Sequence, residues 1–223
     1  MDNSQSCSYS TKLLNKLKAL DSSRVLDFTL INKAICWAKK YHGEQKRKSG
    51  ELFYTHPLEV AYMLADYNLK TEIIVASILH DIVEDTEVTV GMIVDHFSWR
   101  IAEMVDRLTR DRPDGTKLEV ESILNNAYQS KDEEILLIKL FDRLHNLYTL
   151  DSLVLKKQSD IKLETINLFP LVCILLDSMN FGELLIQNLS SDKNSSTSFI
   201  DRFYQKSGAD CLTSSKFIEI IKG

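Results

Sequence analysis

The sequence predicts an all-α protein, and two observations support this prediction. With 7 Gly and 3 Pro in 223 residues, the chain is poor in the turn residues that an all-β fold needs between its strands. Apolar residues instead recur at helical spacing over long stretches. A hydrophobic content of 44% and a charged content of 26% are typical of a globular protein with one sizeable core.

The individual helices follow from apolar periodicity and from their start and stop signals. Gly43 ends the second of them, Pro57 favours the start of the third, and a capping Thr71 opens the fourth. The expected helices span about residues 11–20, 25–42, 57–67, 71–85, 90–109 (a pair), 117–128, 132–150, 160–178 and 213–221. Residues 1–24 are expected to be an N-terminal extension, 25–189 the main domain, and 190–223 a Ser-rich linker with a short terminal helix.

Charge and cysteine usage narrow the function classes. A net charge of −5 argues against a nucleic-acid or anionic-membrane partner, but it leaves room for a local basic pocket that binds a phosphorylated small molecule. No secretory signal and no long apolar span are visible. Cys36 and Cys173 lie in apolar stretches and are interpreted as buried, reduced side chains. We therefore expect a cytoplasmic protein, whose oligomeric state the sequence does not indicate.

One segment, residues 80–86 (HDIVEDT), is unusually rich in metal-capable side chains. His80 and Glu84 are four residues apart, as are Asp81 and Asp85, so each pair shares a face of the expected helix. These groups are costly to bury on an apolar helix unless a metal ion or opposite charges neutralise them. The alternative is an exposed helix end, where the macrodipole disfavours acidic side chains. We interpret the segment as part of a functional site.

A polar stripe lies on the helix expected at residues 132–150. Its members recur at offsets of 0, 3, 7 and 10: Lys139, Asp142, Asn146 and Thr149. Apolar residues flank them, which favours a stripe that faces a central cleft. For the stripe alone, a solvated face is the alternative interpretation, and it is the combination with the segment at residues 80–86 that favours the cleft.

A third position, His56, is expected to be exposed at a helix start. Two nitrogens and at least two carboxylate oxygens would come from His56, His80, Asp81 and Asp142. Such a mixed set suits Mn²⁺, Fe²⁺ or Mg²⁺ with open water positions better than a closed zinc site. The remaining histidines are interpreted as surface or helix-end residues: His42, His96 and His145.

The loop at residues 45–51 (QKRKSGE) places three consecutive cations beside Ser and Gly in an acidic protein. Cationic side chains of this kind bind phosphate groups and nucleotides. A solvated basic loop is the alternative. Three further cations are within reach of a phosphate group on this interpretation: Arg110, Lys117 and Lys139.

These residues carry a family resemblance. The order His56, then His80-Asp81, then Asp142 is similar to that of the HD-domain metal-dependent phosphohydrolases. Three longer strings resemble the hydrolase domain of the RelA/SpoT alarmone enzymes over roughly residues 25–190: RKSGE ending in His56-Pro57, HDIVEDT at 80–86, and IKLFDRLHN at 138–146. No Gly-rich ATP-binding loop is visible, so we expect a hydrolase without a synthetase domain, in a single helical HD-domain bundle.

The resemblance implies removal of the 3′-pyrophosphate of guanosine 3′,5′-bis(diphosphate) (ppGpp) or its pentaphosphate form. One Mn²⁺ per chain would be bound by His56, His80, Asp81 and Asp142. Two carboxylates would position or activate the attacking water: Glu84 and Asp85. The guanine nucleotide would be bound by Arg47, Lys48, Ser49, Lys139, Asn146 and Thr149.

Some positions depart from the family pattern. Leu52-Phe53 stands where the family usually has Pro-Tyr, so a hydroxyl is missing beside the nucleoside pocket. Phe141 replaces a usual Ala next to Asp142, where it would crowd the site. Two alternatives therefore stay open: a phosphohydrolase of the same fold that acts on another phosphorylated nucleotide, and a non-catalytic alarmone-binding protein.

Overall fold

In the computed structural model, which describes residues 8–67, 70–112 and 115–176, the chain is helical with no strand in these segments. The chain divides into two compact units, residues 1–145 and 146–223. The first unit contains α1 (Ser8–Leu20), α2 (Phe28–His42), α3 (Thr55–Leu64), α4 (Thr71–Leu79), α5 (Ile82–Asp85), α6 (Val90–His96), α7 (Trp99–Leu108), α8 (Val120–Gln129) and most of α9 (Glu133–Tyr148). The second contains the end of α9, a 3₁₀ turn η1 (Leu150–Ser152) and α10 (Leu155–Leu175). The all-α prediction is confirmed.

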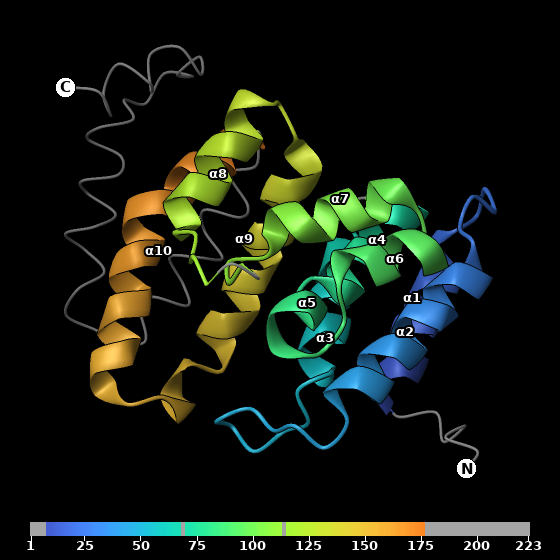
Figure 1. The fold of residues 1–223 in the computed structure, drawn as a ribbon, viewed down its shortest axis with the longest axis horizontal. Helices are drawn as coiled ribbons and strands as arrows, with labels where there is room; N and C mark the ends of the chain where they lie inside the picture. Colours follow the sequence, from blue (N-terminus) through green and yellow to red (C-terminus); the bar gives the residue numbers. More distant parts are fainter. Residues whose placement is uncertain (1–7, 68–69, 113–114, 177–223) are drawn as a thin grey trace. The chain divides into compact units, whose positions relative to one another are not determined.

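Helix α4 is the centre of the first unit (Figure 1). Every residue from Ile73 to Leu79 is buried, and α4 packs against α2, α3 and α7. A helix that is apolar on all sides is stable in water only when other elements cover all of its surface. The apolar run after Thr71 therefore explains why this helix lies in the middle of the unit, with its C-terminal end directed to the candidate site.

Two helix starts differ from their predictions. Thr71 is not an N-cap: α4 begins at Thr71 itself, and the Thr71 hydroxyl accepts a hydrogen bond from the Asp27 main-chain N–H (2.9 Å). Helix α3 begins two residues before Pro57, at Thr55, which a proline in the first turn permits because its missing N–H has no partner there anyway. His56 is consequently inside the first turn and buried, not exposed at a helix start as expected.

The remaining predictions agree with the structure to within a few residues where it can be compared with them. Asp27, Thr89 and Ser98 cap α2, α6 and α7 with side-chain oxygens. Cys173 is buried as expected, but Cys36 is exposed, because it falls on the outer face of α2. The predicted linker and helix at residues 190–223 lie outside the described residues, and the domain boundaries stay a prediction. Among the described helices, none combines the length and hydropathy that a membrane span requires.

Replacing Ile74 with Ala tests the central role of α4. Ile74 is fully buried, so truncation leaves a cavity and is expected to lower the free energy of unfolding by about 2–5 kcal/mol. Denaturant unfolding followed by circular dichroism measures the change. The matched control is Val94→Ala on α6, where the side chain is 41% exposed and a change of at most about 0.5 kcal/mol is expected. Equal effects of the two substitutions would contradict the proposed packing.

Candidate metal and hydrolase site

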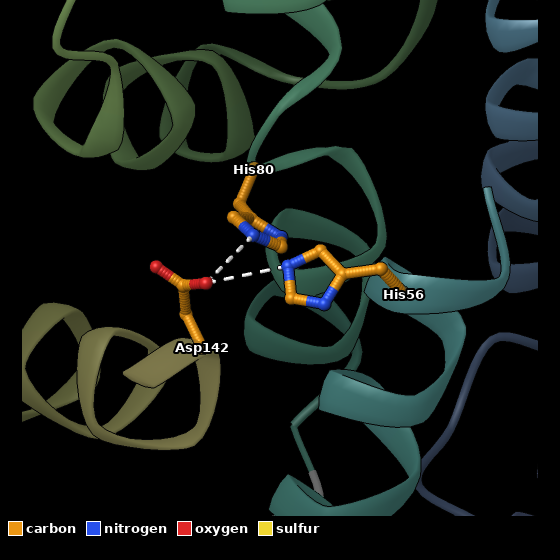
Figure 2. Close-up of side chains that lie close together, drawn as sticks. All are labelled: His56, His80 and Asp142. Carbon is orange, nitrogen blue, oxygen red and sulfur yellow. Dashed lines mark ion pairs between the residues drawn. The ribbon is translucent and has the colours of Figure 1, made fainter. Parts of the chain in front are cut away.

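Four side chains from distant parts of the sequence converge on one point in the first unit. His56 comes from α3, His80 and Asp81 from the junction of α4 and α5, and Asp142 from α9. The His56 Nε2 atom lies 3.3 Å from an Asp142 oxygen and 3.5 Å from an Asp81 oxygen. The His80 Nε2 atom lies 3.1 Å from Asp81 and 3.8 Å from Asp142. Figure 2 shows both rings directed at one carboxylate oxygen of Asp142. Ligand atoms of His56, His80 and Asp142 are close enough together to hold a metal ion.

A break in the helix allows two adjacent residues to reach the same point. The sequence predicts one helix from Thr71 through about Asp85, but α4 ends at Leu79 and α5 begins at Ile82. Adjacent side chains on a regular helix point about 100° apart. At the break, Asp81 adopts φ −100° and ψ −5°, at the edge of the helical region, and its carboxylate lies 3.1 Å from Nε2 of His80. The correction to the predicted helix is thus what makes the pair usable as a site.

Hydrogen bonding fixes which nitrogen of His80 carries the proton. The Nδ1 atom lies 2.8 Å from the main-chain oxygen of Ser77. Because a carbonyl oxygen only accepts, Nδ1 is the donor, and in the neutral ring Nε2 is left with a lone pair. This Nε2 atom is buried and has no hydrogen-bond partner among the described residues. In the neutral ring it would face the two carboxylates as a third acceptor.

A second contact fixes His56 in the same way. Arg47 donates a hydrogen bond from Nη1 to Nδ1 of His145 (3.1 Å), so this Nδ1 atom is an acceptor. His56 Nδ1 lies 2.9 Å from the same atom and must be the donor of that pair. Burial, with the charges of His56 and Arg47, lowers the pKa of His145 to about 3, which keeps its ring neutral. His56 thus also presents an unprotonated Nε2 to the carboxylates, and His145 is not the surface residue that the sequence predicted.

The electrostatics of this cluster require a positive charge. Burial opposes protonation of His80, but Asp81 and Asp142 outweigh it and raise the pKa of His80 to about 10. The histidines in turn hold the pKa of Asp81 at about 2, against the opposite effect of burial. Without a metal ion, a proton on His80 balances part of the charge. The donor set of two imidazole nitrogens and two carboxylates fits a divalent cation, which would satisfy all of these acceptors at once.

Lys139 completes the charge balance around Asp142. Its ammonium lies 3.6 Å from one Asp142 oxygen, while the other oxygen faces the two histidines. Lys139 is buried, so this part of the predicted polar stripe is not a solvated face. The stripe residues Asn146 and Thr149 belong to the second unit, and their predicted contacts with substrate stay predictions.

The two predicted catalytic carboxylates follow Asp81 on α5. Glu84 accepts a hydrogen bond from the main-chain N–H of Arg110 (3.0 Å), which ties α5 to the segment after α7. Loss of solvation, then repulsion from Asp81 and Glu84, raises the pKa of Asp85 to about 7, although the side chain stays accessible to solvent. A carboxylate with a pKa near neutrality and an open side is suited to accept a proton.

The basic loop contributes one cation to the site. Arg47 is partly buried and contacts His145, whereas Lys48 and Ser49 are exposed in the turn at residues 48–50. Burial lowers the pKa of Arg47, and the charges of Asp81 and Asp142 raise it again, as expected for a guanidinium beside the carboxylate cluster. The binding of substrate by Lys48 and Ser49 stays a prediction.

The departures from the family pattern have structural explanations. The Phe53 ring stacks on His42 with a centroid distance of 4.8 Å and meets the edge of His56 at 6.4 Å. The Phe141 ring is buried against Tyr67 (5.2 Å). Phe53 therefore packs next to one proposed metal ligand, His56, and Phe141, which lies beside Asp142 in the sequence, packs against Tyr67.

Sequence reasoning missed two histidines of this site, His42 and His145. His42 is 2% exposed, although it was expected at the surface. For His145 the signal was its spacing, because it follows Asp142 by three residues and so lies on the same face of α9. For His42 the sequence held no comparable signal. His96 is exposed, as expected.

Comparison with known proteins agrees with the resemblance seen in the sequence. The family model described as HD domain matches residues 34–172. A probable guanosine-3′,5′-bis(diphosphate) 3′-pyrophosphohydrolase of Mycoplasma pneumoniae is 38% identical over 151 residues, which is 63% of this chain and 21% of that protein. The guanosine-3′,5′-bis(diphosphate) 3′-pyrophosphohydrolase of Aquifex aeolicus is 37% identical over 145 residues, 62% of this chain and 20% of that protein. The chain thus spans about a fifth of the length of the curated relatives it matches.

A solved structure has a similar fold. It is described as "A metazoan ortholog of SpoT hydrolyzes ppGpp and plays a role in starvation responses". The two structures superpose with a TM-score of 0.52 and 18% sequence identity, over 83% of this chain and 98% of the other. At this identity the likeness establishes the fold alone.

The protonation of the cluster predicts how metal binding depends on pH. Because His80 holds a proton until the pH reaches about 10, a cation that takes its Nε2 must displace that proton. We expect Mn²⁺ binding to release about one proton per ion at pH 7, and the affinity to fall up to about tenfold for each unit of decreasing pH. Calorimetric titrations in buffers of different ionisation enthalpy measure the release. A pH-independent affinity, or Mn²⁺ binding unchanged in Asp142→Asn, would exclude this site.

Proposed function

The chain belongs to the HD-domain family, and from that premise we propose that it is a Mn²⁺-dependent hydrolase that removes the 3′-pyrophosphate of ppGpp or its pentaphosphate form. The observation that carries the proposal is the convergence of His56, His80, Asp81 and Asp142 on one point, with a second carboxylate pair beside it. Relatives in M. pneumoniae and A. aeolicus that share this part of the chain are named for the same reaction.

The proposed metal ligands are His56, His80, Asp81 and Asp142. When bound, the ion would lower the pKa of a coordinated water and polarise a phosphoryl oxygen of the substrate. Mn²⁺ is the proposed ion because nitrogen and carboxylate ligands in an incomplete shell suit it. The chain contributes the orientation of the ligands: the Ser77 carbonyl and His145 hold the two imidazole rings with Nε2 directed at the carboxylates.

The proposed role of Glu84 and Asp85 is to orient the attacking water and to accept its proton. The water oxygen would form a bond to the phosphorus atom that is attached to the ribose 3′ oxygen. The bond between this phosphorus atom and the 3′ oxygen would break. The ribose 3′ oxygen takes up a proton, so the products are GDP or GTP and pyrophosphate. Asp85 is suited to accept the proton because its pKa is about 7. Arg47 and Lys139 would offset the negative charge of the substrate beside the carboxylates.

Phe53 is the observation that keeps a second substrate class in view. Its ring stacks on His42, and it supplies no hydroxyl beside the nucleoside. Nucleotides that carry a 2′- or 3′-phosphate are therefore the appropriate comparison substrates. Ligand-induced stabilisation without any product would instead indicate a non-catalytic alarmone-binding protein.

Incubation of the purified protein with ppGpp and Mn²⁺ tests the proposal. We expect GDP and pyrophosphate as products, and no turnover in the presence of a chelator. Asp81→Asn should lower turnover by at least about a hundredfold because it removes one charge from the metal-capable cluster. The matched control is Asp95→Asn, an exposed aspartate on α6, which should retain parental activity. If Asp81→Asn forms product at the parental rate, the assignment of Asp81 as a metal ligand is wrong.

Substitution of the second carboxylate pair separates proton transfer from metal binding. Glu84→Gln and Asp85→Asn should each lower kcat by about a hundredfold or more, because an amide cannot accept the proton of the attacking water. Mn²⁺ affinity, measured by calorimetry, should stay within about threefold of the parental value. A loss of metal affinity equal to the loss of kcat would assign these residues to metal binding.

A further inference from the structure

His42 is a buried titratable residue that the proposed mechanism does not use. It is the last residue of α2, and its side chain is almost fully enclosed. The helix ends there because Gly43 adopts a positive φ of 49° and donates its N–H to the Lys39 carbonyl. The reversal brings Gln45 back beside the His42 ring, and the Gln45 main-chain N–H bonds to the His42 carbonyl (2.9 Å).

Gln45 connects His42 to the segment that carries the predicted catalytic carboxylates. Its amide nitrogen donates to the main-chain oxygen of Asp85 (2.9 Å), over a separation of 40 residues. The amide oxygen therefore faces the other way, where it lies 3.0 Å from His42 Nδ1. Because that oxygen only accepts, His42 Nδ1 must be the donor. Hydrogen bonds thus run in one direction, from His42 through Gln45 to Asp85.

Packing explains the ring shape at this position but not its nitrogens. The face of His42 stacks on Phe53, a contact that a phenylalanine would make equally well. Its Nε2 atom is buried and has no hydrogen-bond partner among the described residues, which costs free energy. Burial also lowers the pKa of His42, so the ring is neutral, with Nδ1 as its only donor. The presence of a histidine at this position is therefore explained by the hydrogen bond from its Nδ1 atom to Gln45.

We propose that His42 is a positioning residue for the reaction, which acts through Gln45 to hold the main chain of Asp85 and so the direction of its carboxylate. This inference rests on the proposed function, because it assumes that Asp85 serves the hydrolysis. Helix α5 spans only Ile82–Asp85, so its own backbone bonds hold it weakly. The hydrogen bond from Gln45 holds the last residue of this helix, Asp85, whose carboxylate is proposed to contact the attacking water. A displacement of about 1 Å at such a position costs up to about a hundredfold in rate.

The test compares three substitutions in the full-length protein. His42→Phe keeps the stacking and removes Nδ1, Gln45→Met removes both amide contacts, and His42→Asn retains a donor near the Nδ1 position. We expect His42→Phe and Gln45→Met to lower kcat by about ten- to a hundredfold. KM and Mn²⁺ affinity should stay within about twofold, and His42→Asn should recover most of the rate. The double variant should be no slower than the slower single one, since both break the same chain of bonds.

A second readout does not depend on the substrate. The amides of Glu84 and Asp85 bond to the Asp81 carbonyl, so hydrogen exchange in a peptide that covers α5 reports whether the helix is held. His42→Phe and Gln45→Met should speed this exchange several-fold, while His42→Asn and the control His96→Phe, at an exposed helix end, should not. If the parent protein does not cleave ppGpp, the proposed function is wrong. The exchange data still show whether His42 and Gln45 hold α5 in place. Parental kcat and exchange in His42→Phe, or equal impairment of His42→Asn, would overturn the inference.

Discussion

The constraint on which the rest of the first unit depends is the convergence of acceptors in a buried place. The Nε2 atoms of two imidazole rings lie 3.1–3.8 Å from the oxygens of two carboxylates, and Nε2 of His80 has no hydrogen-bond partner among the described residues. Such an arrangement is unstable unless a cation or protons occupy the point of convergence. The surrounding contacts all keep the acceptors aimed there. The Ser77 carbonyl and His145 hold the rings, and Lys139 engages the outer oxygen of Asp142.

The polar cluster, with its cost in free energy, lies at one end of the buried helix α4. Helix α4 is buried on every side and rigid by virtue of its packing, and it ends where the polar cluster begins. The change from α4 to α5 at His80 and Asp81 turns two neighbouring side chains to one point. The irregular backbone is therefore placed where function needs it and where the packed helix can support it.

Much of this could be predicted from the sequence, and the failures have a common cause. Helical periodicity with Gly43 and Pro57 located the helices approximately, and the order of His56, His80-Asp81 and Asp142 in the sequence indicated one metal-capable set. The helix break, the burial of His56 and the participation of His42 and His145 were not predicted. The contact of His56 with His145 joins residues 89 positions apart, and the link from His42 to Asp85 runs through Gln45 over 40 positions, so neither follows from local periodicity. The helix break depends on the backbone at Asp81. Only His145 had a signal in the sequence, its position three residues after Asp142.

Those long-range contacts also link the basic loop to the metal-capable cluster. Arg47 is the loop cation closest to the cluster, and one of its N–H groups is used on His145, which in turn accepts from His56. A guanidinium presents its donors in a rigid plane, so the bond from Nη1 to His145 fixes the direction in which the other donors of Arg47 point. On the proposed function, an anionic substrate and the ring of a proposed metal ligand would thus share one side chain. In this geometry Arg47 joins the basic loop to the cluster, so the proposed contact with an anionic nucleotide would lie next to the groups proposed to cleave it.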